Sequence, residues 1–112
     1  MPTSTRQTDL MPVAYDFTAE LWEWEAKASW YFLTVPVDVS DEMEARMEGF
    51  TRGFGSVRVR VRIGGSEWAT SVFPDTKQQA YVLPVKKAVR TAEGLAVGTA
   101  AAVHLEIVDA RP

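Results

Sequence analysis

The chain has 112 residues, a net charge of −3 and no cysteine, which fits one globular domain and excludes disulfides, thiolate metal sites and cysteine nucleophiles. The negative charge argues against non-specific nucleic-acid binding, which depends on a positive field. No apolar run approaches the roughly 20 residues of a membrane span and the N-terminus lacks a signal peptide's apolar core, so we expect a cytoplasmic, bacterial-type protein.

The chain begins with a polar stretch and two expected strands. Residues 1–12 are threonine-rich and bracketed by prolines, which indicates a flexible leader. In residues 13–25 apolar and polar side chains alternate, which predicts a strand with one buried face. A turn at 25–27 and a second strand at 29–36 follow. Pro36 ends this strand, because proline donates no hydrogen bond to a ladder.

A helix is expected over residues 38–50. Ser40 is its predicted N-cap, and Asp41 and Glu42 then lie in the first turn, where the helix dipole favours negative charge. Gly49 is the expected C-terminal stop. Apolar residues at helical spacing mark the stripe that faces the core: Val39, Met43, Met47 and Phe50.

The next segments are expected to be strands. Residues 57–63 alternate valine or isoleucine with arginine, which predicts a strand with one apolar face. The glycine pair after it predicts a hairpin turn into a strand at 66–73. A loop at 74–79 and a short strand at 80–84, ended again by proline, complete this part of the chain.

A second helix is expected over residues 85–95. Gly94 is its predicted C-cap, Gly98 forms a turn, and the last strand follows at 100–108. The spacing of one buried helix face is met by Val85, Ala88, Val89, Ala92 and Leu95.

The two halves of the chain share a pattern. Each has a strand, a turn, a strand ending in proline, a short helix and a strand, with Pro36-Val37 and Pro84-Val85 as the matching points. Two such units can cover each other's sheet edges in a closed barrel. The sequence therefore predicts a mostly β fold, a small double-split, pseudo-two-fold β-barrel with two short helices, as one domain at 13–109 with a tail at 110–112.

Four blocks, "SWYFLTVP", "RGFGSVRVRVRIGG", "EWATSVFPD" and "YVLPVKKAVRTAEGL", resemble in order the signature blocks of a small bacterial family, the domain of unknown function number nineteen hundred and five. The resemblance spans residues 15–108 and implies a double-split β-barrel with no established activity. Residues 83–107 more loosely resemble the swapped-hairpin regulators of the AbrB type, which are DNA-binding homodimers. Thr99 departs from that pattern, which has an acidic residue there.

A basic cluster follows the second strand-ending proline. If the helix begins after Pro84, its free amides point outward and attract anions. Lys86 and Arg90 are one turn apart and share a helix face. Lys87 points about 100° away from that face. One interpretation is an anion site, and the other is a solvated helix face, at which basic charges oppose the helix dipole.

Three arginines lie on one face of the strand at 57–63: Arg58, Arg60 and Arg62. Their mutual repulsion requires solvation, pairing or a ligand. Cross-strand pairing with Asp16, Glu20 or Glu106 is one interpretation. An arginine-lined groove for a carboxylate, phosphate or nucleic acid is the other, since guanidinium groups suit these anions.

Aromatic side chains are the third feature. The relevant residues are Trp22, Trp24, Trp30, Tyr31 and Trp68. Trp30 and Trp68 are expected in the core, whereas Trp22 and Trp24, on the polar face of their strand, are either exposed or line a pocket. Ser71 and Thr70 near Trp68 are available as hydrogen-bond donors.

Two further features favour ordinary structural roles. The glycine-rich turn at 52–56 is too short for a phosphate-loop fingerprint and serves to bend the backbone. His104, the one histidine, shares a strand face with Glu106, which suggests a surface pair. Without a second histidine or a cysteine, no metal site is expected.

Three classes of function stay open. A binding module requires the tryptophans and the basic cluster in one cleft, and an AbrB-like DNA binder requires basic residues on one outer face. An enzyme requires a nucleophile or an acid–base pair with shifted pKa values, and the sequence contains no motif that indicates either. We expect a monomeric or weakly dimeric barrel that binds a small anionic or aromatic ligand, without metal, cofactor or membrane. The residues assigned to its cleft are Lys86, Lys87, Arg90, Arg58, Arg60, Trp22, Trp24, Trp68 and Ser71.

Overall fold

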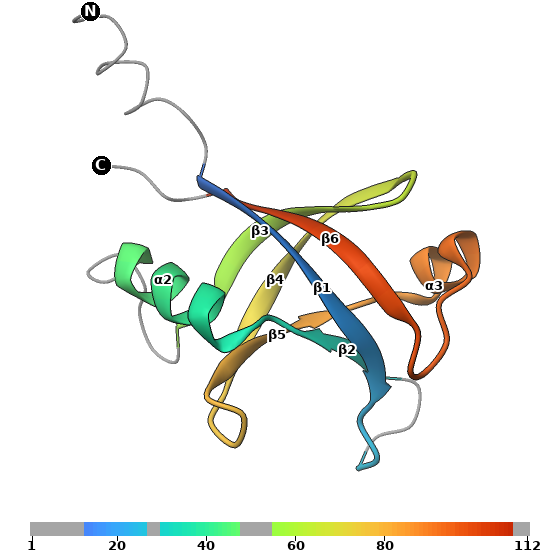
Figure 1. Ribbon diagram of the computed structural model, residues 1–112, viewed down its shortest axis with the longest axis horizontal. Coiled ribbons are helices and arrows are strands. Elements are labelled where there is room, and N and C mark those ends of the chain that lie inside the picture. Colours follow the sequence, from blue (N-terminus) through green and yellow to red (C-terminus); the bar gives the residue numbers. More distant parts are fainter. Residues whose placement is uncertain (1–12, 27–29, 48–54, 109–112) are drawn as a thin grey trace, which may run out of the picture.

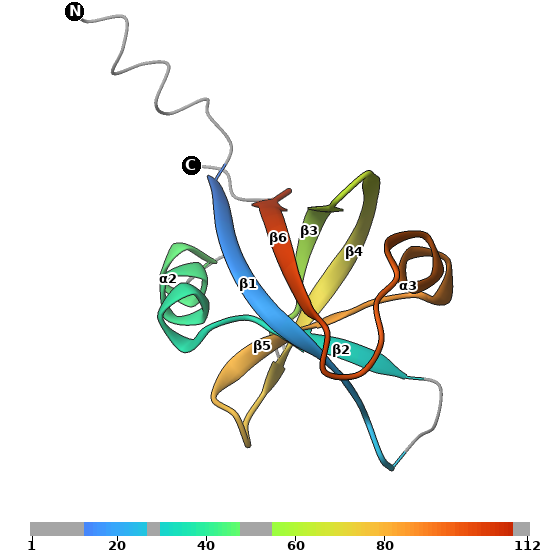
Figure 2. The same cartoon turned by 45° about the vertical axis from the view of Figure 1, so that its right-hand side comes forward.

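The computed structural model describes residues 13–26, 30–47 and 55–108. Six antiparallel strands close into a barrel in the order β1-β2-β5-β4-β3-β6, and helices α2 and α3 lie on opposite sides of it (Figures 1 and 2). The strands are β1 Val13–Glu23, β2 Tyr31–Thr34, β3 Val57–Ile63, β4 Ser66–Asp75, β5 Ala80–Pro84 and β6 Ala100–Ile107, and the helices are α2 Val37–Met47 and α3 Lys87–Glu93. The expected mostly β barrel with two helices is therefore confirmed.

The barrel interior is filled by one face of each strand. β3 alternates buried valine and isoleucine with exposed arginine along its whole length, as its sequence predicts. Leu33 and Leu83 face each other across β2 and β5 and are fully buried, and each such leucine stabilises the fold by about 1.5–3 kcal/mol. Neither described helix has the length or apolar character that crossing a bilayer would require.

The barrel has a pseudo-two-fold arrangement that can be followed in its register. Exchanging β1, β2 and β3 with β4, β5 and β6 leaves the strand order unchanged. Val35 donates its N–H to the carbonyl of Tyr81, and Val85 donates equivalently to Tyr31, both at 2.9 Å. Tyr31 therefore corresponds to Tyr81, Val35 to Val85, and the start of α2 to the start of α3.

This register corrects the predicted matching points. Pro36 directly precedes α2, whereas Pro84 is the last residue of β5, paired with Phe32 of β2. The counterpart of Pro36 is Lys86, the N-cap of α3. The expectation that both prolines open a helix was wrong for Pro84, because proline still fits a strand end at which no N–H donor is needed.

Ser40 has a different role from the predicted N-cap. α2 begins at Val37, and the Ser40 N–H already bonds to the Pro36 carbonyl at 2.8 Å. The Ser40 hydroxyl is buried, donates to the Val35 carbonyl at 3.2 Å and accepts the Tyr81 N–H at 3.0 Å. Ser40 thus fastens α2 to β5, and Asp38 is the acidic residue of the first turn.

The predicted helix stripes are partly confirmed. Met43 and Met47 are buried and Val39 is partly buried, while Gly49 and Phe50 lie outside the described residues. In the second helix the buried or partly buried residues are Val85, Val89 and Leu95. Ala88 and Ala92 are exposed, contrary to expectation, because α3 is short and presents only a narrow stripe to the barrel. Gly94 is the C-cap as predicted, with a left-handed φ of 65°.

Candidate functional site

The basic cluster lines a cavity of about 600 Å³ between β2, β4 and α3, which we call the basic cavity. The side chains that define its chemistry are Trp30, Tyr31, Trp68, Lys86, Lys87 and Arg90. The structure thus brings the three predicted cations together with Trp68, and it adds Trp30 and Tyr31 to them. Lys86 and Lys87 are exposed, so their ammonium groups are open to solvent.

Arg90, which lines this cavity, is held by two contacts. Its guanidinium carbon lies 3.9 Å from the centroid of the Tyr31 ring, and its Nε donates to the Val85 carbonyl at 3.2 Å. A cation over an aromatic face contributes about 0.5–2 kcal/mol. Two different contacts therefore fix the guanidinium, and its terminal N–H groups have no acceptor among the described residues.

Lys86, Lys87 and Arg90 form no ion pair with a carboxylate within the part of the chain that the structure describes. The ion pairs found there join Arg46 to Glu42 and His104 to Asp16. Glu93, the acidic residue of α3, instead accepts a hydrogen bond from Ser66 at 2.6 Å. Internal neutralisation thus does not explain the cluster. α3 spans 7 residues, and the amide site expected at its start stays a prediction.

The tryptophans divide between the inside and the outside of the barrel. Trp68 is buried, at 8% exposure, as predicted. Trp30 is 44% exposed, so the prediction that it packs in the core was wrong. Phe32 faces outward from β2, and the rings of Trp22 and Trp30 lie 5.1 and 6.1 Å from it. Trp30 therefore covers an outward-facing phenylalanine instead of entering the core.

Trp22 and Trp24 line a second cavity, of about 540 Å³, together with Phe32 and the turn after β4. The Trp22 indole N–H donates to the Thr34 hydroxyl at 2.8 Å, which donates in turn to Gln78 at 2.8 Å. These two tryptophans are thus partly exposed pocket residues, as one sequence interpretation held, but their pocket is separate from the basic cavity.

Arg58, Arg60 and Ser71 do not line either cavity. Arg58 lies opposite Ser71 on β4, and Arg60 lies opposite Ala69 on β4 and Glu106 on β6. Both arginines are exposed on the outside of the barrel. The single cleft expected from the sequence is therefore divided into the basic cavity, the tryptophan pocket and this outer arginine face.

His104 pairs across the sheet and not along its own strand. Its Nδ1 lies 2.8 Å from an Asp16 carboxylate oxygen on β1, which is well exposed. The predicted neighbour Glu106 lies opposite Arg60 instead. Pairs of this exposure contribute about 0.2–1 kcal/mol. Among the described residues, no group of three or more His, Cys, Asp or Glu side chains is placed to hold a metal ion.

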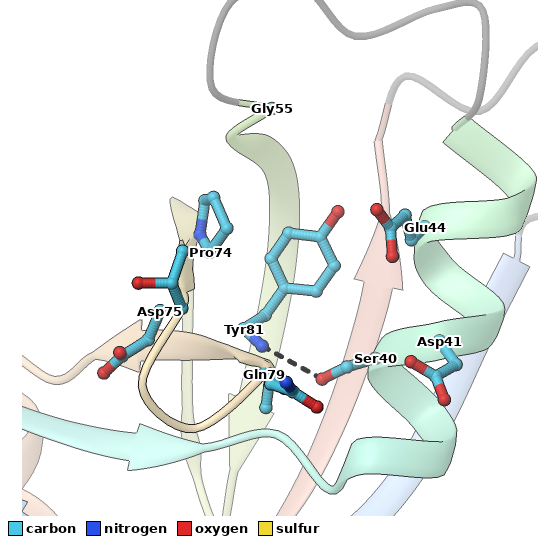
Figure 3. Close-up of a pocket in the computed structure, with 10 residues that line it drawn as sticks. Ser40, Asp41, Glu44, Gly55, Pro74, Asp75, Gln79 and Tyr81 are labelled. Carbon is cyan, nitrogen blue, oxygen red and sulfur yellow. Dashed lines mark hydrogen bonds between the residues drawn. The ribbon is translucent and has the colours of Figure 1, made fainter.

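Sequence reasoning missed a third cavity, of about 580 Å³, which we call the acidic cavity (Figure 3). It lies between α2, the end of β4 and the start of β5, and its carboxylates belong to Asp41, Glu44 and Asp75. Tyr81 stands inside it, and burial, reinforced by the charge of Glu44, raises the pKa of its phenol above 10.0. The correct register of the internal repeat would have pointed to Tyr81, since it is the counterpart of Tyr31.

A protein-family model matches most of the chain. The family model described as Domain of unknown function (DUF1905) matches residues 17–105, which include every strand in whole or in part and both helices. No curated protein matches the chain.

Proposed function

The chain belongs to the DUF1905 family, a domain of unknown function, and we propose that it binds a small anionic ligand with a planar ring in the basic cavity. The observation that carries this proposal is the convergence of Lys86, Lys87 and Arg90, unpaired within the described residues, on a cavity walled by aromatic rings.

The cavity has two kinds of surface, which suit two parts of one ligand. Trp30, Tyr31 and Trp68 supply apolar ring surface, on which a planar group gains contact area. The lysines and Arg90 supply positive charge for a phosphate or carboxylate. The volume of about 600 Å³ falls within the roughly 300–1,000 Å³ of small-molecule sites.

Preorganisation also favours a ligand at this place. Arg90 is already fixed by Tyr31 and Val85, so binding an anion costs little further loss of its side-chain freedom. Lys86 and Lys87 are exposed and flank it, so they provide long-range attraction for an anion without being needed by the fold.

The proposal is tested by an NMR titration of the ¹⁵N-labelled protein with 1-naphthyl phosphate, a probe that combines a phosphate with a planar ring. We expect the indole signals of Trp30 and Trp68 to shift, and those of Trp22 and Trp24 to stay in place, because the latter line a separate cavity. Inorganic phosphate and 1-naphthol, titrated separately, report what each half of the probe contributes.

Lysine variants test whether the positive charge of the cavity contributes to binding. Replacing Lys86 and Lys87 together by alanine should weaken binding of 1-naphthyl phosphate about 5- to 30-fold, since each exposed ion pair contributes up to about 1 kcal/mol. Lys77→Ala is the matched control, because this lysine is exposed but lines the tryptophan pocket. Equal effects of the double variant and the control, or binding of duplex DNA with a steep salt dependence and no effect of the probe, would refute the proposal.

A further inference from the structure

The acidic cavity and the basic cavity share a few corresponding positions of the internal repeat, while their other lining residues differ. Tyr81 corresponds to Tyr31, and Ser40 corresponds to Arg90 by the register of the two halves. The correspondence extends to single hydrogen bonds: Ser40 Oγ donates to the Val35 carbonyl at 3.2 Å, as Arg90 Nε donates to the Val85 carbonyl at 3.2 Å.

At one of these positions the basic cavity has a cation and the acidic cavity has none. In the basic half, the Arg90 guanidinium lies over the Tyr31 ring. In the acidic cavity the corresponding residue is Ser40, whose short side chain bonds only to backbone groups of Val35 and Tyr81. The described residues that line this cavity include no lysine or arginine. Tyr81 therefore lines a cavity to which Ser40 brings no positive charge, whereas Arg90 lies over the ring of its counterpart Tyr31.

Negative charge surrounds that space. Glu44 and Asp41 project from α2, and Asp75 lies across the cavity at the end of β4 (Figure 3). Glu44 and Asp41 make no ion pair with any described residue, whereas Asp75 already accepts hydrogen bonds from the Lys77 N–H and the Gln78 amide. Two uncommitted carboxylates on one wall attract a positive ligand, and Asp75 adds to the field from the other side.

The Tyr81 hydroxyl supplies an independent indication of a ligand. The residue is only 7% exposed, yet its hydroxyl has no hydrogen-bond partner among the described residues and points into the cavity on the side of Glu44 (Figure 3). The hydroxyl oxygen keeps some accessible surface, so a group bound in the cavity can reach it. A donor N–H group of a bound cation would provide a hydrogen-bond partner.

We propose that the acidic cavity binds a guanidinium or primary alkylammonium group of an organic cation, seated against the Tyr81 ring and between Glu44 and Asp41. The three carboxylates lie around the cavity without converging, and no described cluster is placed to hold a metal ion. The volume of about 580 Å³ suits an extended molecule more than a single inorganic ion.

Agmatine, which carries a guanidinium and an ammonium group, is the probe for this site. In an NMR titration at low salt, we expect shifts confined to α2, the turn after β4 and Tyr81, with MgCl₂ at equal ionic strength as the reference. Shifts of the same residues by Mg²⁺ would overturn the proposal, and so would agmatine shifts spread over the whole acidic surface.

Three variants examine the contacts. Glu44→Gln and Asp41→Asn should each weaken agmatine binding about two- to fivefold, because exposed ion pairs contribute little individually. Tyr81→Phe, which keeps the aromatic ring, should weaken agmatine binding about two- to tenfold through the lost hydrogen bond. Glu20→Gln on β1 is the matched control, since it removes the same charge at an exposed position outside the cavity. An equal loss in the control would overturn the site.

A second copy of the chain is the other source of such a cation, because its own Lys86 and Lys87 are exposed. Sedimentation velocity over a range of protein concentrations separates the two. A monomer at all concentrations, together with agmatine binding, supports the small-molecule site. Self-association that agmatine disrupts and that Lys86→Ala with Lys87→Ala abolishes would overturn it in favour of the second copy.

Discussion

Ser40→Ala removes the side chain that fastens α2 to β5. The alanine leaves the buried Tyr81 N–H without its acceptor at 3.0 Å and deletes the hydrogen bond to the Val35 carbonyl at 3.2 Å. An unsatisfied buried donor costs about 1–3 kcal/mol. Alanine is the better helix former by about 0.5 kcal/mol, which offsets part of this loss. The expected net destabilisation is therefore about 0.5–2.5 kcal/mol.

Urea unfolding followed by tryptophan fluorescence measures this free energy directly. The urea concentration at the unfolding midpoint should fall. The dependence of the unfolding free energy on urea concentration should stay constant, because the surface exposed on unfolding is unchanged. Tm should fall by roughly 2–10 °C. Ser56→Ala, at an exposed position before β3, is the control and should change stability by less than about 0.5 kcal/mol. If Ser40→Ala is as stable as this control, the Ser40 contact does not hold the helix, and the reasoning fails.

Three further results are expected. Leu83→Ala, at a fully buried position paired with Leu33, should cost about 2–5 kcal/mol in urea unfolding, and a loss below about 1 kcal/mol would contradict the interior packing. Replacing Lys86 and Lys87 by alanine should change Tm by no more than the Ser56→Ala control, because both side chains are exposed and unpaired within the described residues; a marked loss would show a structural role. Burial raises the pKa of Tyr15 and Tyr81 above 10.0, with Glu42 and Glu44 adding to the shift. The folded state therefore favours the protonated phenols, and this stability is present below pH 10 and is lost as the pH rises through the raised values. Tyr81→Phe should accordingly lose less stability between pH 9 and 11 than the parent, and an equal loss would refute the burial argument.

The strands of the barrel could be predicted from the sequence because alternation is a local signal. The arginines and valines of 57–63 assign one face of β3 to the core without reference to any other segment. The closed barrel followed from the repeat, since two half-units cover each other's edges.

The register of the repeat could not be predicted from its prolines. Pro84 ends β5 and Pro36 precedes α2, so the same residue type serves two backbone positions. The role of Ser40 was missed for a related reason: the hydrogen bond that decides it comes from Tyr81, a residue distant in the sequence. Capping rules describe only local partners.

The division of the site into separate cavities also depends on tertiary structure. The sequence pattern predicted a core position for both Trp30 and Trp68, but Trp30 packs against the outward-facing Phe32, while Trp68 is buried in the barrel. The acidic cavity combines Asp41 and Glu44 of α2 with Asp75 of β4. Residue types alone predicted the members of the basic cluster, whereas only the fold showed which aromatic rings lie beside it.

The most direct test of this account is to titrate one ¹⁵N-labelled sample with 1-naphthyl phosphate and a second with agmatine, and to compare the residues that respond. We expect the anion to shift Trp30, Trp68 and α3, and the cation to shift Tyr81, α2 and the turn after β4, with little overlap. Shifts by both probes at the same residues, or an anion that leaves Trp30, Trp68 and α3 unchanged, would contradict the account.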